Sequence, residues 1–306
     1  MSTEIGIFLP TMGDTDGAPG DVVAAARQAE DLGFESAWAV DQLVAGQGAP
    51  LLDSGLALAA AAVATERIRL AYGVAVVPLH PAVWLAKQVA TLQHLSGGRV
   101  ILGVGAGGDR HTRSWAAAGV PARERGARLD AALAVLPALI AGEPTVVPEL
   151  PGAPTVELAP GVTVPPLVVG GMADAAVRRV LDHDAGWFLL PFGPDGTAAA
   201  RARIAGAAAA AGKPLPHLTA STMVALEGDP ALPSPEAVRA LLTDPRGRFG
   251  MPAEAADDAV VRGDPAAVAE HLAALAGAGA DRVVVTVAAG DWHRQADLLA
   301  EAAALL

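Results

Sequence analysis

Short apolar runs alternate with amphipathic stretches along almost the whole chain. Runs typical of buried strands occupy residues 5–9, 36–40, 68–77, 100–104, 167–169, 186–190, 218–226 and 282–287. Apolar residues at helical spacing occupy residues 20–32, 53–65, 82–95, 122–141, 172–183, 195–211, 264–278 and 291–305. Such alternation predicts a parallel sheet covered by helices.

The number of strand–helix pairs favours one α/β architecture. Eight pairs is the number that closes a (β/α)8 barrel, or TIM barrel, whose active site lies at the carboxyl-terminal ends of the strands. A doubly wound open sheet is the alternative, but it gives no reason for this number. We therefore predict a barrel.

Residues 81–108 form the most informative of these units. Pro81 opens a predicted helix at a position where its missing N–H costs nothing. Ser96-Gly97-Gly98 ends that helix with residues suited to a left-handed turn. The nearly continuous apolar run that follows ends in Gly105-Ala106-Gly107-Gly108, where a ligand can approach the backbone closely.

Two segments break the alternation. Residues 143–166 are rich in proline and valine and are predicted to form a hairpin or an extended excursion. Residues 227–262 carry five prolines and many acidic residues. In barrels such insertions form walls or lids of the active site, and solvated surface loops are the alternative.

Composition excludes several classes of protein. The net charge of −12 argues against general binding of nucleic acid. Without cysteine, the chain has neither disulfides nor thiolate metal sites. Its Ala-rich stretches are too short to span a bilayer, and the amino terminus lacks the pattern of a secretory signal. We therefore expect a cytoplasmic protein that binds neither membrane nor nucleic acid.

Candidate chemistry gathers after two of the predicted strands. Arg110, His111 and Arg113 follow the glycines of the fourth strand; the arginines can hold an anionic group, and His111 can donate a hydrogen bond to a substrate. Gly170-Gly171 joins the fifth strand to a helix, where backbone N–H groups attract phosphate. Histidines at metal-ligand spacing, a nucleophile elbow and a Walker loop are all missing from the sequence, so we expect no metal site.

The chain resembles the luciferase-like monooxygenase superfamily, which holds flavin-dependent monooxygenases and deazaflavin (F420)-dependent oxidoreductases. Within 81–108 the resemblance rests on Pro81, Ala86-Lys87, Thr91-Leu92, Ser96-Gly97-Gly98-Arg99 and Leu102-Gly103-Val104-Gly105. Residues 33–41, 165–171 and 263–283 extend it to nearly the full chain. It implies a (β/α)8 barrel, here as one domain over residues 1–306.

The resemblance also implies where a cofactor would lie. Asp41, Gly73, Val74, Ala106, Gly107, Arg110, Gly170 and Gly171 are the expected cofactor-binding residues, with a non-prolyl cis peptide bulge at Gly73–Val74 and the phosphate at Gly170-Gly171. Asp41, Gln42 and His111 are the candidates for a catalytic role.

Two positions depart from the family pattern. Gln42 stands where the family often has histidine, and glutamine cannot exchange protons near neutral pH. Gly108 stands where the sugar-phosphate dehydrogenases of the family carry a glutamate. The mechanism of those dehydrogenases is therefore disfavoured.

The resemblance leaves three hypotheses for the function. The first is an oxidoreductase that transfers hydride between coenzyme F420 and a small organic substrate. The second is an FMN-dependent monooxygenase supplied by a flavin reductase. The third is a barrel that has kept only the fold. As relatives commonly do, the chain is expected to form a homodimer through the helices at 53–65 and 82–95.

Overall fold

The predicted barrel is confirmed in the computed structural model, which describes residues 3–13, 17–46, 48–108, 112–191, 193–256 and 258–306. Eight parallel strands close into a ring, and the last pairs with the first through Glu4 opposite Arg282. In order around the ring they are β1 (Glu4–Phe8), β2 (Ser36–Ala39), β3 (Arg69–Tyr72), β5 (Val100–Gly105), β8 (Leu167–Gly170), β9 (Gly186–Pro191), β10 (Leu218–Leu226) and β12 (Arg282–Val287).

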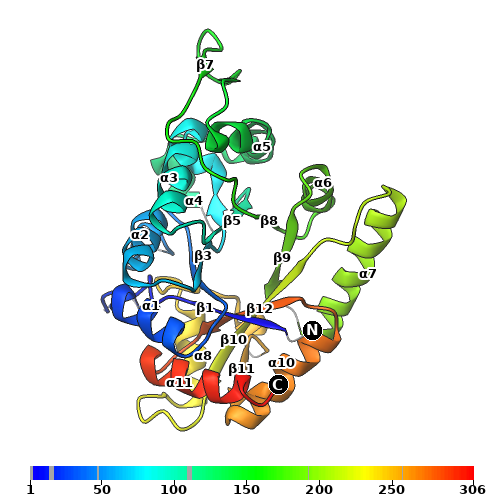
Figure 1. The fold of residues 1–306 in the computed structure, drawn as a ribbon. Helices are drawn as coiled ribbons and strands as arrows, with labels where there is room; N and C mark the ends of the chain where they lie inside the picture. The colour runs from blue at the N-terminus through cyan, green and yellow to red at the C-terminus, as the bar shows by residue number, and fades with distance from the viewer. Residues whose placement is uncertain (1–2, 14–16, 47, 109–111, 192, 257) are drawn as a thin grey trace.

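Helices form the outer layer around this ring (Figure 1). Four of them begin after an aspartate whose carboxylate accepts main-chain N–H bonds of the first turn, which explains where they start. The helices predicted from periodicity are α1 (Val22–Asp31), α2 (Ser54–Ala64), α3 (Ala82–Leu95), α5 (Arg125–Ala141), α6 (Asp174–Asp182), α7 (Pro194–Ala210), α10 (Pro265–Gly277) and α11 (Trp292–Ala303).

The predicted strand at 68–77 is wrong as a single strand. The structure divides it into β3 and the short β4 (Ala75–Val76), which pairs with β5, and a 3₁₀ turn η1 (Val77–Leu79) follows. Apolar periodicity could not show the division, because the residues on both sides of it are apolar.

The two insertions have structure of their own. Residues 143–166 contain the predicted hairpin, formed by β6 (Thr145–Val146) and β7 (Thr155–Val156). Residues 227–262 hold α8 (Pro235–Thr243) and α9 (Ala253–Ala256), and β11 (Val260–Gly263) extends the sheet beside β10. The pattern did not predict α8, α9 or β11, nor α4 (Thr112–Ala117). The predicted helix at 122–141 begins as a 3₁₀ turn, η3 (Ala122–Glu124), before α5.

Aromatic and aliphatic side chains fill the middle of the ring. Trp38 is fully buried there, and its ring centroid lies 6.3 Å from that of Phe8 and 5.3 Å from that of Phe188. Its indole N–H donates to the hydroxyl of Ser36 over 2.7 Å. The barrel is therefore filled in the middle and has no open channel along its axis there.

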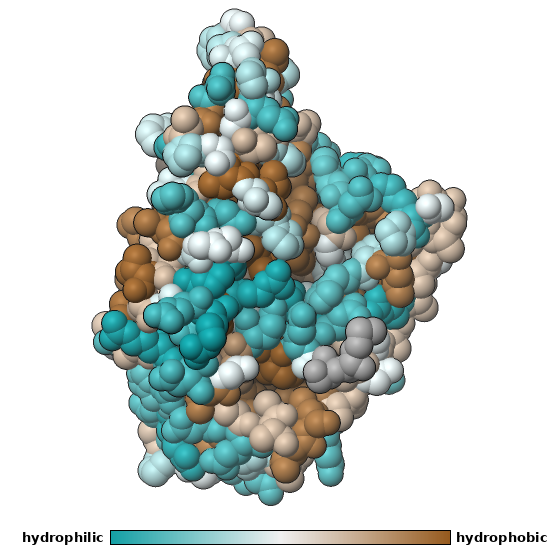
Figure 2. Space-filling model, in the orientation of Figure 1, coloured by the Kyte–Doolittle hydropathy of each residue, from teal (hydrophilic) through white to brown (hydrophobic). Residues whose placement is uncertain are grey.

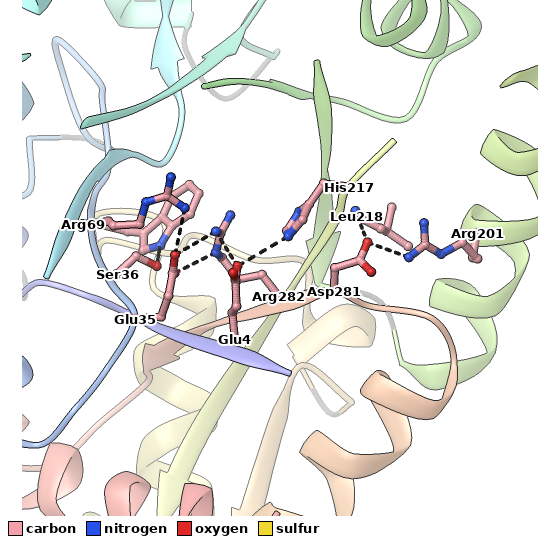
Figure 3. Close-up of polar contacts among 10 residues, drawn as sticks. Glu4, Glu35, Ser36, Arg69, Arg201, His217, Leu218, Asp281 and Arg282 are labelled. Carbon is pink, nitrogen blue, oxygen red and sulfur yellow. Dashed lines mark hydrogen bonds and ion pairs between the residues drawn. The ribbon is translucent and has the colours of Figure 1, made fainter. Parts of the chain in front are cut away.

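An ionic cluster closes the amino-terminal end of the ring (Figure 3). Arg282 donates to both carboxylate oxygens of Glu35, over 2.8 and 2.9 Å, and lies 2.5 Å from Glu4. Its guanidinium also lies 5.9 Å from the ring centroid of Trp38. Since Arg282 is buried, this end of the barrel serves stability, as is usual for this fold.

Candidate active site at the carboxyl-terminal mouth of the barrel

The backbone bulge between β3 and β4 is the centre of the candidate site. The Gly73–Val74 peptide is cis, as the family resemblance led us to expect. Glycines on the two neighbouring strands make room for the bulge. A Cβ at Gly103 would lie 2.1 Å from the carbonyl oxygen of Tyr72, and one at Gly105 would lie 2.8 Å from Val74 Cγ2. Gly170 on β8 also borders the bulge, since a Cβ there would lie 3.1 Å from Val74 Cγ2.

Gly73 lies against the aromatic side chains that fill the ring. A Cβ there would lie 2.5 Å from Phe8 Cε1 and 3.0 Å from Trp38 Cε3. Phe8, Trp38 and the bulge therefore pack together, and together they form the floor of the carboxyl-terminal mouth.

The carboxylate of Asp41 is used by the protein itself. One oxygen accepts the amide of Val76 over 2.7 Å and lies 2.8 Å from His80 Nε2, and the other accepts the hydroxyl of Ser54 over 3.2 Å. Burial favours the neutral form of Asp41, but these bonds and the imidazolium of His80 prevail and lower its pKa. Asp41 thus holds β4 two residues beyond the bulge; its direct contact with a cofactor stays a prediction.

The pair of Asp41 and His80 predicts how stability responds to pH. Burial disfavours charge on His80, but the bond to Asp41 and its charge raise the pKa of the imidazole. A raised folded-state pKa stabilises the protein fully below the ordinary value and loses that effect as pH rises through the raised one. From pH 6 to pH 9 we therefore expect the free energy of unfolding to fall more in wild type than in His80→Gln, as measured by urea titration. If the free energy of unfolding changes with pH equally in wild type and in His80→Gln, Asp41 and His80 do not form a charged pair.

The turn after β8 is the predicted phosphate site. Gly171 has φ +123°, and the turn leads into α6. The indole N–H of Trp187 donates to the carbonyl oxygen of Gly171 over 2.7 Å, and Arg203 donates to that of Met172 over the same distance. These bonds fix the turn, and the guanidinium of Arg203 also pairs with Asp174, the first residue of α6. The main-chain amides at the amino terminus of α6 remain the feature that favours an anion there.

A cavity of about 190 Å³ opens above the floor of the mouth. It borders Gly73, Gln42 from the end of β2, Trp292 from the start of α11, and Phe249 and Met251 from the second insertion. The insertion reaches the loop after β2, since a Cβ at Gly46 would lie 2.5 Å from the carbonyl oxygen of Gly247. Of the two predicted roles for residues 227–262, a wall of the mouth is the one observed.

The remaining predicted residues lie around this mouth or outside the described residues. Gly107, with φ +69°, packs beneath Trp115 and Val76, each 2.8 Å from its Cβ position. Ala106 precedes it directly after β5. Arg110 and His111 lie outside the residues that the structure describes, so their roles stay predictions.

The sequence analysis missed Arg203, Trp187, Phe249 and Met251. Arg203 lies in an Ala-rich helix and meets Met172 across 31 positions of the chain. Phe249 and Met251 lie in the proline-rich insertion. Hydrophobic periodicity depends on residues that are near one another in the sequence. It therefore cannot predict contacts between residues that are far apart in the chain.

Comparison with known families decides which kind of barrel this is. A family model described as luciferase-like monooxygenase matches residues 3–282. The chain belongs to the luciferase-like monooxygenase family. The fold is therefore that of a luciferase-like barrel.

Relatives with similar sequences cover only part of this luciferase-like chain. An uncharacterized protein of Mycobacterium tuberculosis is 34% identical over 142 residues, which are 46% of this chain and 48% of that protein. The F420-dependent glucose-6-phosphate dehydrogenase of Beutenbergia cavernae is 40% identical over 135 residues, which are 41% of this chain and 38% of that enzyme. The aligned region of this chain thus spans about half of the length of these relatives or less.

Solved structures match the luciferase-like barrel over its full length. An F420-dependent secondary alcohol dehydrogenase in complex with an F420-acetone adduct has a TM-score of 0.80 at 18% identity, covering 99% of this chain and 98% of that one. A type II Baeyer-Villiger monooxygenase of Pseudomonas putida, in complex with FMN, has a TM-score of 0.74 at 19% identity, covering 98% and 96%. At these identities the likeness establishes the fold alone.

Proposed function

We propose that this protein is an oxidoreductase that binds coenzyme F420 at the carboxyl-terminal mouth and transfers hydride between it and a small organic substrate. The observation that carries the proposal is the bulge at Gly73–Val74, which borders the mouth beside the turn at Gly170-Gly171. A flat ring resting on this bulge would bring its phosphate chain toward α6.

The residues at the mouth fit such a group. The bulge offers backbone and a short side chain against the ring, and a Cβ at Gly171 would meet only Ala176, at 3.5 Å, so space remains at the turn. The deazaflavin, when bound, supplies the hydride chemistry. The chain's own residues would bind the phosphate at the amides that begin α6, exclude water with Phe8 and Phe188, and orient the substrate through Gln42.

Two relatives support F420 as the cofactor. The glucose-6-phosphate dehydrogenase and the secondary alcohol dehydrogenase named above are both F420-dependent. The monooxygenase from Pseudomonas putida, in complex with FMN, supports the second candidate, an FMN-dependent monooxygenase that needs a flavin reductase as partner. Separate titrations of the purified protein with F420 and FMN, followed by fluorescence, test the choice. Binding of FMN alone would replace the proposal by the second candidate, and binding of neither would favour a barrel without catalysis.

The phosphate turn can be tested with two variants of one residue. Gly171→Ala and Gly171→Asp share the backbone strain of a side chain at φ +123°, and only the aspartate adds negative charge. We expect Gly171→Asp to bind F420 at least about tenfold more weakly than Gly171→Ala, since it opposes the phosphate. Equal affinities, measured by titration at low salt, would remove the turn from the site.

An exposed apolar face supports a homodimer. Leu56 and Val63 on α2 are 74% and 73% exposed, and Trp84 on α3 is 67% exposed. Figure 2 shows an apolar patch over α2 at the left edge. We propose that a second copy of the chain covers it, as large exposed patches usually have a partner.

We expect wild type to be a dimer and Leu56→Asp with Val63→Asp to be a monomer by light scattering at micromolar concentration. Leu215→Asp, which changes an exposed leucine between α7 and β10, is the control and should stay a dimer. A monomeric wild type would contradict the proposal.

Among the described residues, no helix is both long and apolar enough to cross a membrane.

A further inference from the structure

The mouth concentrates residue types that the rest of the chain uses sparingly. The chain has five methionines, and Met12, Met223 and Met251 border the 190 Å³ cavity. Of five phenylalanines, Phe8, Phe188 and Phe249 border it, as does Trp292. Most of the apolar residues elsewhere are small or aliphatic, so this wall differs from the general core. Methionine and aromatic side chains adapt to apolar ligands of varied shape.

Charge is nearly absent from the wall of this cavity. Arg248 is the one charged side chain among the described residues that line it. Its guanidinium donates to the carbonyl oxygen of Ala288 over 2.6 Å and lies 4.7 Å from the ring centroid of Phe249. Arg248 therefore joins the insertion to the end of β12. Recognition of a phosphate or carboxylate usually uses charge-assisted or bidentate bonds from several donors. The described residues that line this wall do not present such a cluster.

Neutral hydrogen-bonding groups complete the lining. Gln42, Thr11 and Thr286 contribute an amide and two hydroxyls. Thr222 also lines the cavity, and its hydroxyl lies 3.1 Å from His271 Nε2. Ser221 is also there, but its hydroxyl donates to the carbonyl oxygen of Leu189 over 2.9 Å. An apolar wall with a few neutral polar groups is typical of sites for uncharged organic molecules. The volume lies below the roughly 300–1,000 Å³ of sites for drug-sized ligands, so the ligand is compact.

From these observations we infer that the substrate is a compact, uncharged, mostly apolar molecule with one carbonyl or hydroxyl oxygen. It lies between the barrel residues Met12, Met223 and Trp292 and the insertion residues Phe249 and Met251. That this ligand is the substrate rests on the proposed function, whereas the selectivity of the cavity rests on its lining alone. Sugar phosphates and small carboxylates are then expected to bind more weakly than neutral ligands of similar size.

The selectivity can be measured on the protein without a cofactor. Acetophenone and benzoate have similar size and shape but differ in charge, and glucose 6-phosphate is polar and anionic. We expect calorimetric titration to show acetophenone bound at least about tenfold more tightly than either anion. Equal or tighter binding of benzoate or glucose 6-phosphate would overturn the inference.

Variants of the insertion locate the binding. We expect Met251→Ala and Phe249→Ala each to weaken acetophenone binding several-fold, whereas Leu215→Ala, at an exposed site away from the cavity, leaves it unchanged. Met251→Lys places a cation in the wall and should shift the preference toward benzoate. If both alanine variants bind acetophenone as wild type does, the ligand does not lie against the insertion. This test does not depend on whether the lysine variant folds.

Failure of this inference and failure of the proposed function give different results. If F420 binds but benzoate is preferred, only the substrate class is wrong. If neither F420 nor FMN binds while acetophenone is still selected, the cavity is as inferred and the proposed function is wrong.

Discussion

Arg282→Met is expected to lower the free energy of unfolding by about 3 kcal/mol. The change removes the cation that both oxygens of Glu35 and one of Glu4 share, and it leaves two carboxylates near one another at the end of the barrel. We place the loss at the low end of the range for a broken buried pair, because the side chains of Glu35 and Glu4 are 21% and 39% exposed.

A surface ion pair gives the matched control for this variant. Arg128 lies 3.0 Å from Glu124 one helical turn away, and both side chains are exposed. We expect Arg128→Met to cost about 0.5 kcal/mol or less, as measured by urea titration. Similar losses in the two variants would show that the cluster in Figure 3 contributes no more than a surface pair.

The contribution of the same cluster to stability should depend on pH in the acid range. Burial favours neutral Glu35, but the bonds from Arg282 and its charge prevail and lower the pKa of the carboxyl. A depressed folded-state pKa stabilises the protein above the ordinary value and loses that effect as pH falls through the depressed one. Wild type should therefore lose more stability than Arg282→Met as the pH falls below about 4.5.

The second large effect concerns the bulge. We expect Gly105→Ala to weaken binding of F420 about tenfold or more, because the new methyl would lie 2.8 Å from Val74 Cγ2 and would force the bulge to shift. Overpacking of this kind also costs about 1–3 kcal/mol of stability. Fluorescence titration measures the affinity.

The same loop offers a control and a rescue. A Cβ at Gly108 would have no neighbour within 4 Å, so Gly108→Ala should bind F420 as wild type does. Val74→Ala combined with Gly105→Ala frees the crowded space and should restore part of the affinity. If Gly105→Ala binds normally, the bulge does not support the cofactor.

The repeating units of the fold could be predicted from sequence because each is a local pattern. Residues 218–226 and 282–287 are strands over the predicted bounds, since continuous apolar runs end where polar or turn residues begin. The division after Tyr72 escaped the pattern, because what decides it is the room that Gly103 and Gly105 leave on another strand. The small elements within 227–262 escaped as well, because prolines and acids there resemble a plain loop.

The candidate site was predictable only in part, and mostly through the family. The resemblance led to the cis peptide at Gly73–Val74, which the structure has. That the glycine turn at 170–171 holds a phosphate stays a prediction. The partners of Asp41 and the contacts of Arg203 join distant segments, so neither periodicity nor motif could supply them. The wall from Phe249 and Met251 depends on how the insertion folds back over the barrel.

A crystal structure of the protein soaked with F420 would test the central claim most directly. We expect the deazaflavin ring against Val74 at the mouth and its phosphate at the turn of Gly170-Gly171, with the apolar wall of Phe249 and Met251 facing the ring. A ring bound elsewhere on the protein, or an empty mouth at saturating F420, would contradict the claim.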